Sequence, residues 1–139
     1  MTLTVPFHSE YPLNPKHFGS KYGLSGVYAL VRDGVCVYIG ISGNVWSRWV
    51  QHRSQLRSGR HASAALGQLF KREEEHLWSF RFLIEEGHST STLNEKALIQ
   101  VLRPIGNKGI YRIYGRDPEG RLERARLIAQ QEFPDPVAP

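Results

Sequence analysis

The stretch GVYALVRDGVCVYIGISGNVWSRWVQH, residues 26–52, decides how the rest of the chain can be arranged. Two runs rich in β-forming residues, 27–31 and 35–39, flank Arg32-Asp33-Gly34, which has the composition of a hairpin turn. A third strand is predicted over residues 78–85, WSFRFLIE, where large apolar side chains alternate with Ser, Arg and Leu. The sequence thus predicts a hairpin with one further strand.

The length of the turn decides whether the two tyrosines of the hairpin can act together. A two-residue loop, Asp33-Gly34, would place Tyr28 and Tyr38 on opposite faces, because side-chain direction alternates along a strand. A three-residue loop that includes Arg32, with Gly34 in the left-handed region, would place the tyrosines directly across from each other. We predict the three-residue loop.

A helix should follow the hairpin, capped by Ser42 or Asn44. Its apolar residues recur at helical spacing: Val45, Trp49 and Leu56. The same spacing leaves Arg48 and His52 one turn apart on a neighbouring face. Polar groups are therefore predicted to cluster beside an apolar seam.

Three more helices are predicted from apolar spacing, over residues 62–72, over residues 92–102 and near the C-terminus. The last of these has an apolar stripe of Leu122, Ala125, Ile128, Ala129 and Phe133. Prolines and glycines interrupt residues 1–24, which predicts an irregular arm that is neither a regular helix nor a central strand. We divide the chain into this arm, one domain over residues 25–110 and a helical extension over residues 111–139 that packs on the domain.

Composition permits a nucleic-acid partner without requiring one. The chain has 139 residues, about one domain, and its 18 Lys and Arg against 13 Asp and Glu give a net charge of +5. Its single cysteine, Cys36, excludes an intrachain disulfide framework and a cysteine-built zinc site, so we expect a reducing, cytoplasmic setting. No run of 18 apolar residues predicts a membrane span, and the final helix could meet a second copy of the chain or a partner protein.

Charged residues after the hairpin have two interpretations each. Arg53, Arg57 and Arg60 could bind phosphate oxygens, or they could form a solvated helix end that favours cations. The side chains of the run Glu73-Glu74-Glu75 would point in three different directions on a helix, so they cannot converge on one ion. We therefore interpret the run as a solvated helix end.

The motifs that stand out, in chain order, are Gly26-Val27-Tyr28, Tyr38-Ile39-Gly40, Asn44-Val45, Arg48, His52, Glu95 and Pro104-x-x-Asn107-x-Gly109. Taken together, they resemble the motifs of the GIY-YIG nuclease family over residues 26–109. The resemblance implies an α/β (α+β) fold with a three-stranded antiparallel sheet flanked by helices. It also implies an enzyme, a metal-dependent DNA endonuclease.

The resemblance also implies a role for each motif residue. Tyr28 would be the general base, and His52 would take or share its proton. Arg48 would bind the scissile phosphate, and Tyr38 would orient it. Glu95 would hold one Mg²⁺ or Mn²⁺, mostly hydrated.

The resemblance implies the roles of some further site residues less directly. In some members of the family a histidine at a place comparable to His61 belongs to the active site, and Asn107 would fix the local loop rather than do chemistry. With Arg48, the arginines Arg53, Arg57 and Arg60 are the predicted DNA contacts.

Glu95 also has a purely structural interpretation. Thr92-Leu93-Asn94-Glu95 fits a capping box, in which Glu95 would only bond the backbone N–H of Thr92. Two other functions compete with cleavage: a nucleic-acid-binding module without activity, and a subunit of a larger nuclease or repair assembly.

Overall fold

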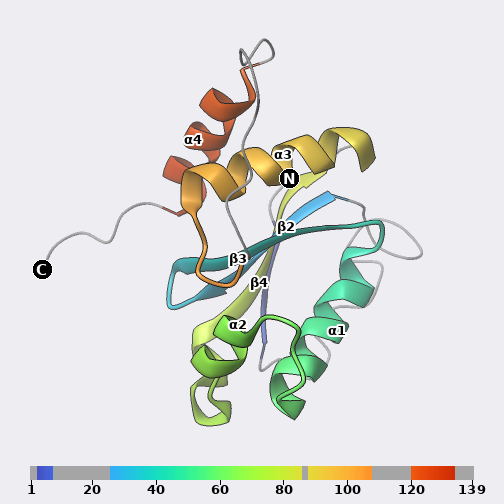
Figure 1. The fold of residues 1–139 in the computed structure, drawn as a ribbon, viewed down its shortest axis with the longest axis vertical. Helices are drawn as coiled ribbons and strands as arrows, with labels where there is room; N and C mark the ends of the chain where they lie inside the picture. Colours follow the sequence, from blue (N-terminus) through green and yellow to red (C-terminus); the bar gives the residue numbers. More distant parts are fainter. Residues whose placement is uncertain (1–2, 8–25, 86–87, 108–119, 134–139) are drawn as a thin grey trace, which may run out of the picture.

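The computed structural model describes residues 3–7, 26–85, 88–107 and 120–133. It has mixed α+β architecture, with one four-stranded antiparallel sheet of order β1-β4-β2-β3 and helices on both faces (Figure 1). The elements in chain order are β1 (Leu3–Pro6), β2 (Gly26–Arg32), β3 (Val35–Ser42), α1 (Val45–Ser58), α2 (Ala64–Leu69), the 3₁₀ helix η2 (Arg72–Leu77), β4 (Trp78–Glu85), α3 (His88–Leu102) and α4 (Arg121–Glu132).

The sheet separates two apolar clusters, which explains why β2 is buried on both of its faces. Tyr28 and Leu30 point into one cluster, together with residues of α1, α2 and β4. Val27 and Ala29 point into the other, together with residues of α3 and α4. In Figure 1, α1 and α2 accordingly lie below the sheet, and α3 and α4 lie above it. The alternation of strand side chains therefore assigns the tyrosines to the α1 side.

The sheet has four strands, so the expected count of three was wrong. The extra strand, β1, comes from the segment that was expected to be irregular, and it pairs with β4 at the edge of the sheet. An edge position tolerates Pro6, which lacks a backbone N–H. Val5 and Phe7 are buried, so the apolar cluster holds this segment in place. Residues 8–25 lie outside the described part.

The hairpin has a two-residue loop, so the predicted three-residue loop was wrong. Asp33 and Gly34 both have positive φ, +50° and +81°, which is the geometry of a tight Asp-Gly turn. Tyr28 pairs with Gly40 and Tyr38 pairs with Leu30, so the prediction that the tyrosines lie directly across from each other was also wrong. They still share a face, because the register shifts between the pairs Leu30–Tyr38 and Val31–Cys36. This bulge adds one residue to β3. Side chains of β3 beyond the bulge therefore point to the face opposite the one that the two-residue turn alone would give them.

The helix after the hairpin forms as predicted. Asn44 is the N-cap of α1, with its side-chain oxygen accepting the Ser47 N–H at 3.1 Å. Gly59 ends α1 in the left-handed conformation, at φ +72°. The next helix, α2, is shorter than the predicted range 62–72. Ser63 is its N-cap, because the Ser63 hydroxyl oxygen accepts the Leu66 N–H at 3.3 Å, and the 3₁₀ helix η2 begins at Arg72.

The helix that bears Glu95 begins earlier than predicted, and this excludes the capping box. Because α3 starts at His88, Thr92 lies inside the helix and cannot be its N-cap. The final helix, α4, packs on α3 as expected, with Ala125 and Ala129 buried. In the described part of the chain no helix is long and apolar enough to cross a membrane.

Candidate active site

The side chain of Tyr28 is the centre of the predicted site. It is only 2% exposed, and its ring stacks on Phe80 with the centroids 4.7 Å apart. The Tyr38 ring stacks beside it at 6.3 Å, which confirms that the two tyrosines share one face. Tyr28 Oη lies 2.7 Å from His52 Nε2 on α1. The hairpin and α1 thus bring the predicted base and its histidine into direct contact.

Gly40 makes room for the Tyr28 hydroxyl. Tyr28 pairs with Gly40 across the hairpin, and a Cβ on Gly40 would overlap Tyr28 Oη and lie 2.6 Å from Cζ. Any side chain at this position would therefore move the tyrosine away from His52. Position 40 requires glycine because of this close approach, and not because of its backbone conformation.

A chain of hydrogen bonds extends from Tyr28 into the loop before α2. His52 Nδ1 lies 2.8 Å from His61 Nε2, and the backbone N–H of Ser63 donates to His61 Nδ1 at 2.9 Å. The imidazole rings of His52 and His61 stack with their centroids 5.0 Å apart. The structure therefore connects His61 to the site through His52.

Burial sets the protonation of these groups. It raises the pKa of Tyr28 well above its ordinary value, and the field of Tyr38 adds to the rise. It lowers the pKa of His52 to about 3, with the charges of His61 and Arg48 acting in the same direction. Burial also lowers the pKa of His61. Both histidines are therefore neutral at neutral pH.

Two charged residues shift the pKa of Tyr28 in opposite directions. The guanidinium of Arg48 lowers the pKa of the tyrosine, whereas the carboxylate of Glu95 raises it. Glu95 is half-buried on α3, burial raises its pKa, and it accepts the backbone N–H of Ile41 at the end of β3. The charges of an arginine from α1 and a carboxylate from α3 thus both influence the ionisation of Tyr28.

Asn107 and Gly106 attach the loop after α3 to the edge of β3. The Asn107 amide accepts the Ile39 N–H at 2.9 Å and donates to the Ile39 carbonyl at 2.8 Å. Gly106 donates to the Val37 carbonyl at 2.7 Å, and its own carbonyl accepts the Ser63 hydroxyl at 2.8 Å. The loop pairs the free edge of the sheet, in agreement with the expected role for Asn107. Gly109 lies outside the described residues.

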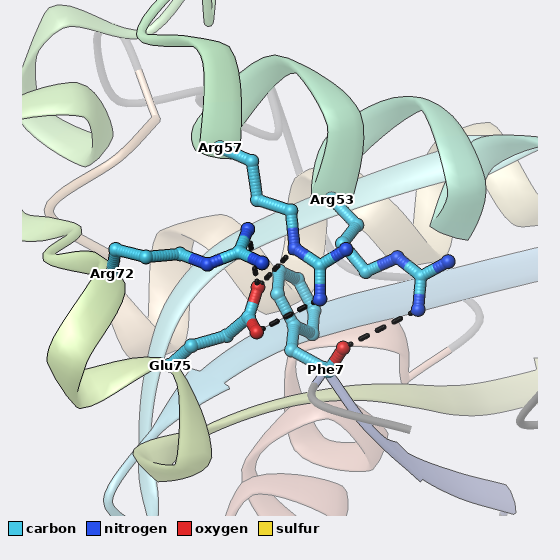
Figure 2. Close-up of polar contacts among 5 residues, drawn as sticks. All are labelled: Phe7, Arg53, Arg57, Arg72 and Glu75. Carbon is cyan, nitrogen blue, oxygen red and sulfur yellow. Dashed lines mark hydrogen bonds and ion pairs between the residues drawn. The ribbon is translucent and has the colours of Figure 1, made fainter. Parts of the chain in front are cut away.

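Three of the four arginines predicted to bind DNA have partners within the chain. Arg48 Nη1 donates to Gln51 Oε1 at 2.9 Å. Arg57 Nε and Nη2 donate to the two carboxylate oxygens of Glu75, the second at 2.9 Å (Figure 2). Arg53 lies 4.0 Å over the Trp49 ring and donates to the Phe7 carbonyl at 3.4 Å. Arg60 is exposed.

Glu75 is not the solvated residue that the acidic run suggested. Its side chain is only 8% exposed, and Arg72 adds a contact at 3.8 Å to the bidentate pair with Arg57. Burial alone would raise the pKa of Glu75, but the hydrogen bonds and charge of Arg57, with the charges of Arg72 and Arg53, outweigh burial and lower it. The pair ties α1 to η2 and commits Arg57 to a structural role.

Glu75→Gln should lower the free energy of unfolding by about 2 kcal/mol at neutral pH, because it leaves the Arg57 guanidinium without its countercharge. The ionised carboxylate stabilises the fold above its ordinary pKa, and this contribution is lost as the pH falls through the lowered folded pKa. Urea unfolding should therefore show a gap between the two proteins that closes in acid. The exposed Glu73→Gln is the matched control, and equal stability of all three proteins at neutral pH would contradict the expectation.

The predicted metal site depends on the carboxylate of Glu95. Among the described residues no three His, Cys, Asp or Glu side chains gather into a metal-binding group. Glu95 is half-buried, and its charge raises the pKa of Tyr28, whereas the charge of Arg48 lowers it. A single oxygen ligand fits Mg²⁺, which keeps several of its waters when bound.

Gly40, Ser63 and Gly106 shape the site but were absent from the predicted site residues. Gly40 was quoted only as part of a motif, although a glycine between β-forming residues can signal a close approach. A Cβ on Gly106 would lie 2.6 Å from both Leu66 and the Val37 carbonyl. Ser63 acts through its backbone N–H, which no sequence pattern reveals.

Comparisons with protein-family models, with curated proteins and with solved structures return no match to this chain.

Proposed function

We propose that this protein is a metal-dependent endonuclease of the GIY-YIG type that hydrolyses phosphodiester bonds in DNA. One observation carries the proposal: a buried tyrosine hydroxyl lies 2.7 Å from the Nε2 of a neutral histidine, and the charges of an arginine and a carboxylate shift the pKa of this tyrosine in opposite directions. An apolar core has no need of this combination of titratable groups.

The chemistry requires three things of the protein. The attacking water must lose a proton, the phosphate charge must be neutralised, and the leaving 3′ oxygen must be stabilised. Tyr28 is the proposed base, and Arg48 is the proposed phosphate ligand. Tyr38 orients the phosphate from the neighbouring position on the sheet, where its ring lies 5.3 Å from that of His52.

Glu95 is the proposed ligand for one Mg²⁺ or Mn²⁺, and the Ile41 N–H fixes its carboxylate. A bound divalent cation supplies positive charge for the phosphate and the leaving oxygen. Burial raises the pKa of Tyr28, and a cation held by Glu95 would add positive charge that favours the ionised form of the tyrosine.

DNA binding is assigned mainly to Arg48 and Arg60, and Arg48 would exchange its exposed hydrogen bond to Gln51 for a phosphate oxygen. Arg57 is held by Glu75 and Arg53 covers Trp49, so their contribution to phosphate binding requires a change of partner or a second contact. Among the described residues, the exposed end of α1 therefore offers fewer phosphate ligands than the sequence alone suggests.

The test is cleavage of a panel of duplex, single-stranded, nicked and branched DNAs by the purified protein in Mg²⁺, in Mn²⁺ and in EDTA. We expect cutting only with the divalent cation. Tyr28→Phe keeps the stacking on Phe80 but removes the hydroxyl, and it should lower the rate by about 10²-fold or more with the melting temperature nearly unchanged. Cutting in EDTA, or a fully active Tyr28→Phe, would refute the proposal.

A further inference from the structure

The hydrogen bond at the far end of the histidine pair fixes where the protons lie. A backbone N–H can only donate, so the Ser63 N–H at 2.9 Å requires His61 Nδ1 to be an unprotonated acceptor. The opposite tautomer would bring two N–H groups face to face and leave both without an acceptor in a partly buried place. Neutral His61 therefore has its proton on Nε2.

The same reasoning applies to the imidazole ring of His52. His61 Nε2–H points at His52 Nδ1, 2.8 Å away, which must then be the acceptor. Neutral His52 in turn has its proton on Nε2, the atom that lies 2.7 Å from Tyr28 Oη. His52 therefore donates to the tyrosine oxygen, and its Nε2 has no lone pair with which to take the tyrosine's proton.

The proton of Tyr28 must then point elsewhere. The Tyr38 ring stacks beside that of Tyr28 with the centroids 6.3 Å apart, and a side-chain hydrogen bond with Tyr38 contributes to the raised pKa of Tyr28. The Tyr38 side chain is partly exposed. With His52 acting as a donor, Tyr38 is the neighbour that can accept from the Tyr28 O–H. The donors are thus aligned in one direction, from the Ser63 N–H through His61, His52 and Tyr28 to Tyr38.

We propose, on the basis of the proposed nuclease function, that the histidine pair is a fixed hydrogen-bond donor to Tyr28 and that the tyrosine loses its proton outward through Tyr38, not inward to His52. In this sequence the Tyr28 O–H proton passes to the Tyr38 oxygen while Tyr38 releases its own hydroxyl proton to solvent water. The Tyr28 phenolate, stabilised by the His52 N–H, then takes a proton from the attacking water as the new O–P bond forms. The leaving 3′ oxygen takes a proton from solvent, so the protons balance over one turnover.

This assignment differs from the role that the family resemblance implied for His52. Burial supports it, because a histidine whose pKa is lowered to about 3 is a poor proton acceptor. Ser63 and His61 are positioning residues in this scheme, since neither needs to touch the substrate. Their function is to hold the tautomer of His52.

The first test reads the tautomers directly, by ¹⁵N NMR of the histidine side chains in the full chain without metal or DNA. We expect the proton on Nε2 of both His52 and His61. Ser63→Ala keeps the backbone N–H and should keep both tautomers. Ser63→Pro removes the N–H at a φ of −83° that suits proline, and it should let His52 populate both tautomers. A wild-type His52 with its proton on Nδ1 would overturn the proposal.

The second test uses cleavage. His52→Gln retains an N–H donor near Tyr28 but cannot accept a proton, so it should lose no more than about tenfold, whereas His52→Leu should lose about 10²-fold or more. Tyr38→Phe should lose activity to the same extent as Tyr28→Phe. Glutamine and leucine variants of equal activity would overturn the proposal. If the wild type cuts no DNA, the nuclease function fails while the tautomer measurement still decides the direction of the chain.

Discussion

Glu95→Gln should abolish DNA cleavage in Mg²⁺ while leaving the fold intact. The substitution removes the single carboxylate proposed to hold the cation and keeps nearly the same side-chain shape, so the Ile41 N–H can still bond the amide oxygen. Loss of an electrostatic group aimed at the transition state costs about 10²-fold or more in rate. The capping-box explanation no longer competes, because α3 begins at His88.

The measurement pairs the cleavage rate with the melting temperature and with DNA affinity in EDTA. Burial of Glu95 disfavours its charge, so the neutral glutamine should not lower the melting temperature at neutral pH. DNA affinity without metal should hold or rise, because a negative charge near the phosphate is lost. Glu73→Gln, an exposed residue on η2 with the same change of charge, should cut normally. An active Glu95→Gln would contradict the one-metal mechanism.

Gly40→Ala should have the second large effect, through the position of Tyr28. The added methyl would overlap the tyrosine hydroxyl and lie 2.6 Å from Cζ, and the ring cannot retreat freely because Phe80 stacks on it. We expect the contact with His52 to break and cleavage to fall as far as in Tyr28→Phe. Overpacking at such a site costs about 1–3 kcal/mol of stability.

A double-mutant cycle separates this overlap from other effects of alanine. In the background of Tyr28→Leu, whose shorter side chain leaves the space vacant, Gly40→Ala should cost little stability. Chemical unfolding of the four proteins gives the coupling between the two positions. Gly43→Ala is a control, because a Cβ there meets nothing within 4 Å and φ is not positive. Equal costs of Gly40→Ala in both backgrounds would show that Tyr28 is not the obstacle.

Most of the predicted elements were recoverable from the sequence because their signals are local. The strand Trp78–Glu85, the Asn44 cap and the apolar stripe of α4 depend on residues a few positions apart. The fourth strand was missed because β1 has four residues and ends in proline, and only its pairing with β4 makes it a strand. A weak local signal was overridden by burial of Val5 and Phe7.

The candidate site divides in the same way. The order and spacing of Tyr28, Tyr38, Arg48, His52 and Glu95 come from the sequence, and their chemistry can be argued from it. The partners of the charged residues outside these motifs could not be predicted. Arg57 and Glu75 each read as solvated, yet they form a bidentate pair because α1 and η2 meet. The sequence around a charged residue does not show whether the fold places an oppositely charged residue next to it.

The sequence by itself determined which residues can do chemistry and which element carries each of them. Only the tertiary structure decided how they face one another. The tyrosines share a face because a bulge in β3 offsets a two-residue turn, and bulges depend on the pairing of two strands. The direction of the hydrogen bonds to Tyr28 depends on one backbone N–H, that of Ser63, which the fold brings to His61. A backbone amide is common to every residue except proline, so its position in space, and not its identity, carries the information.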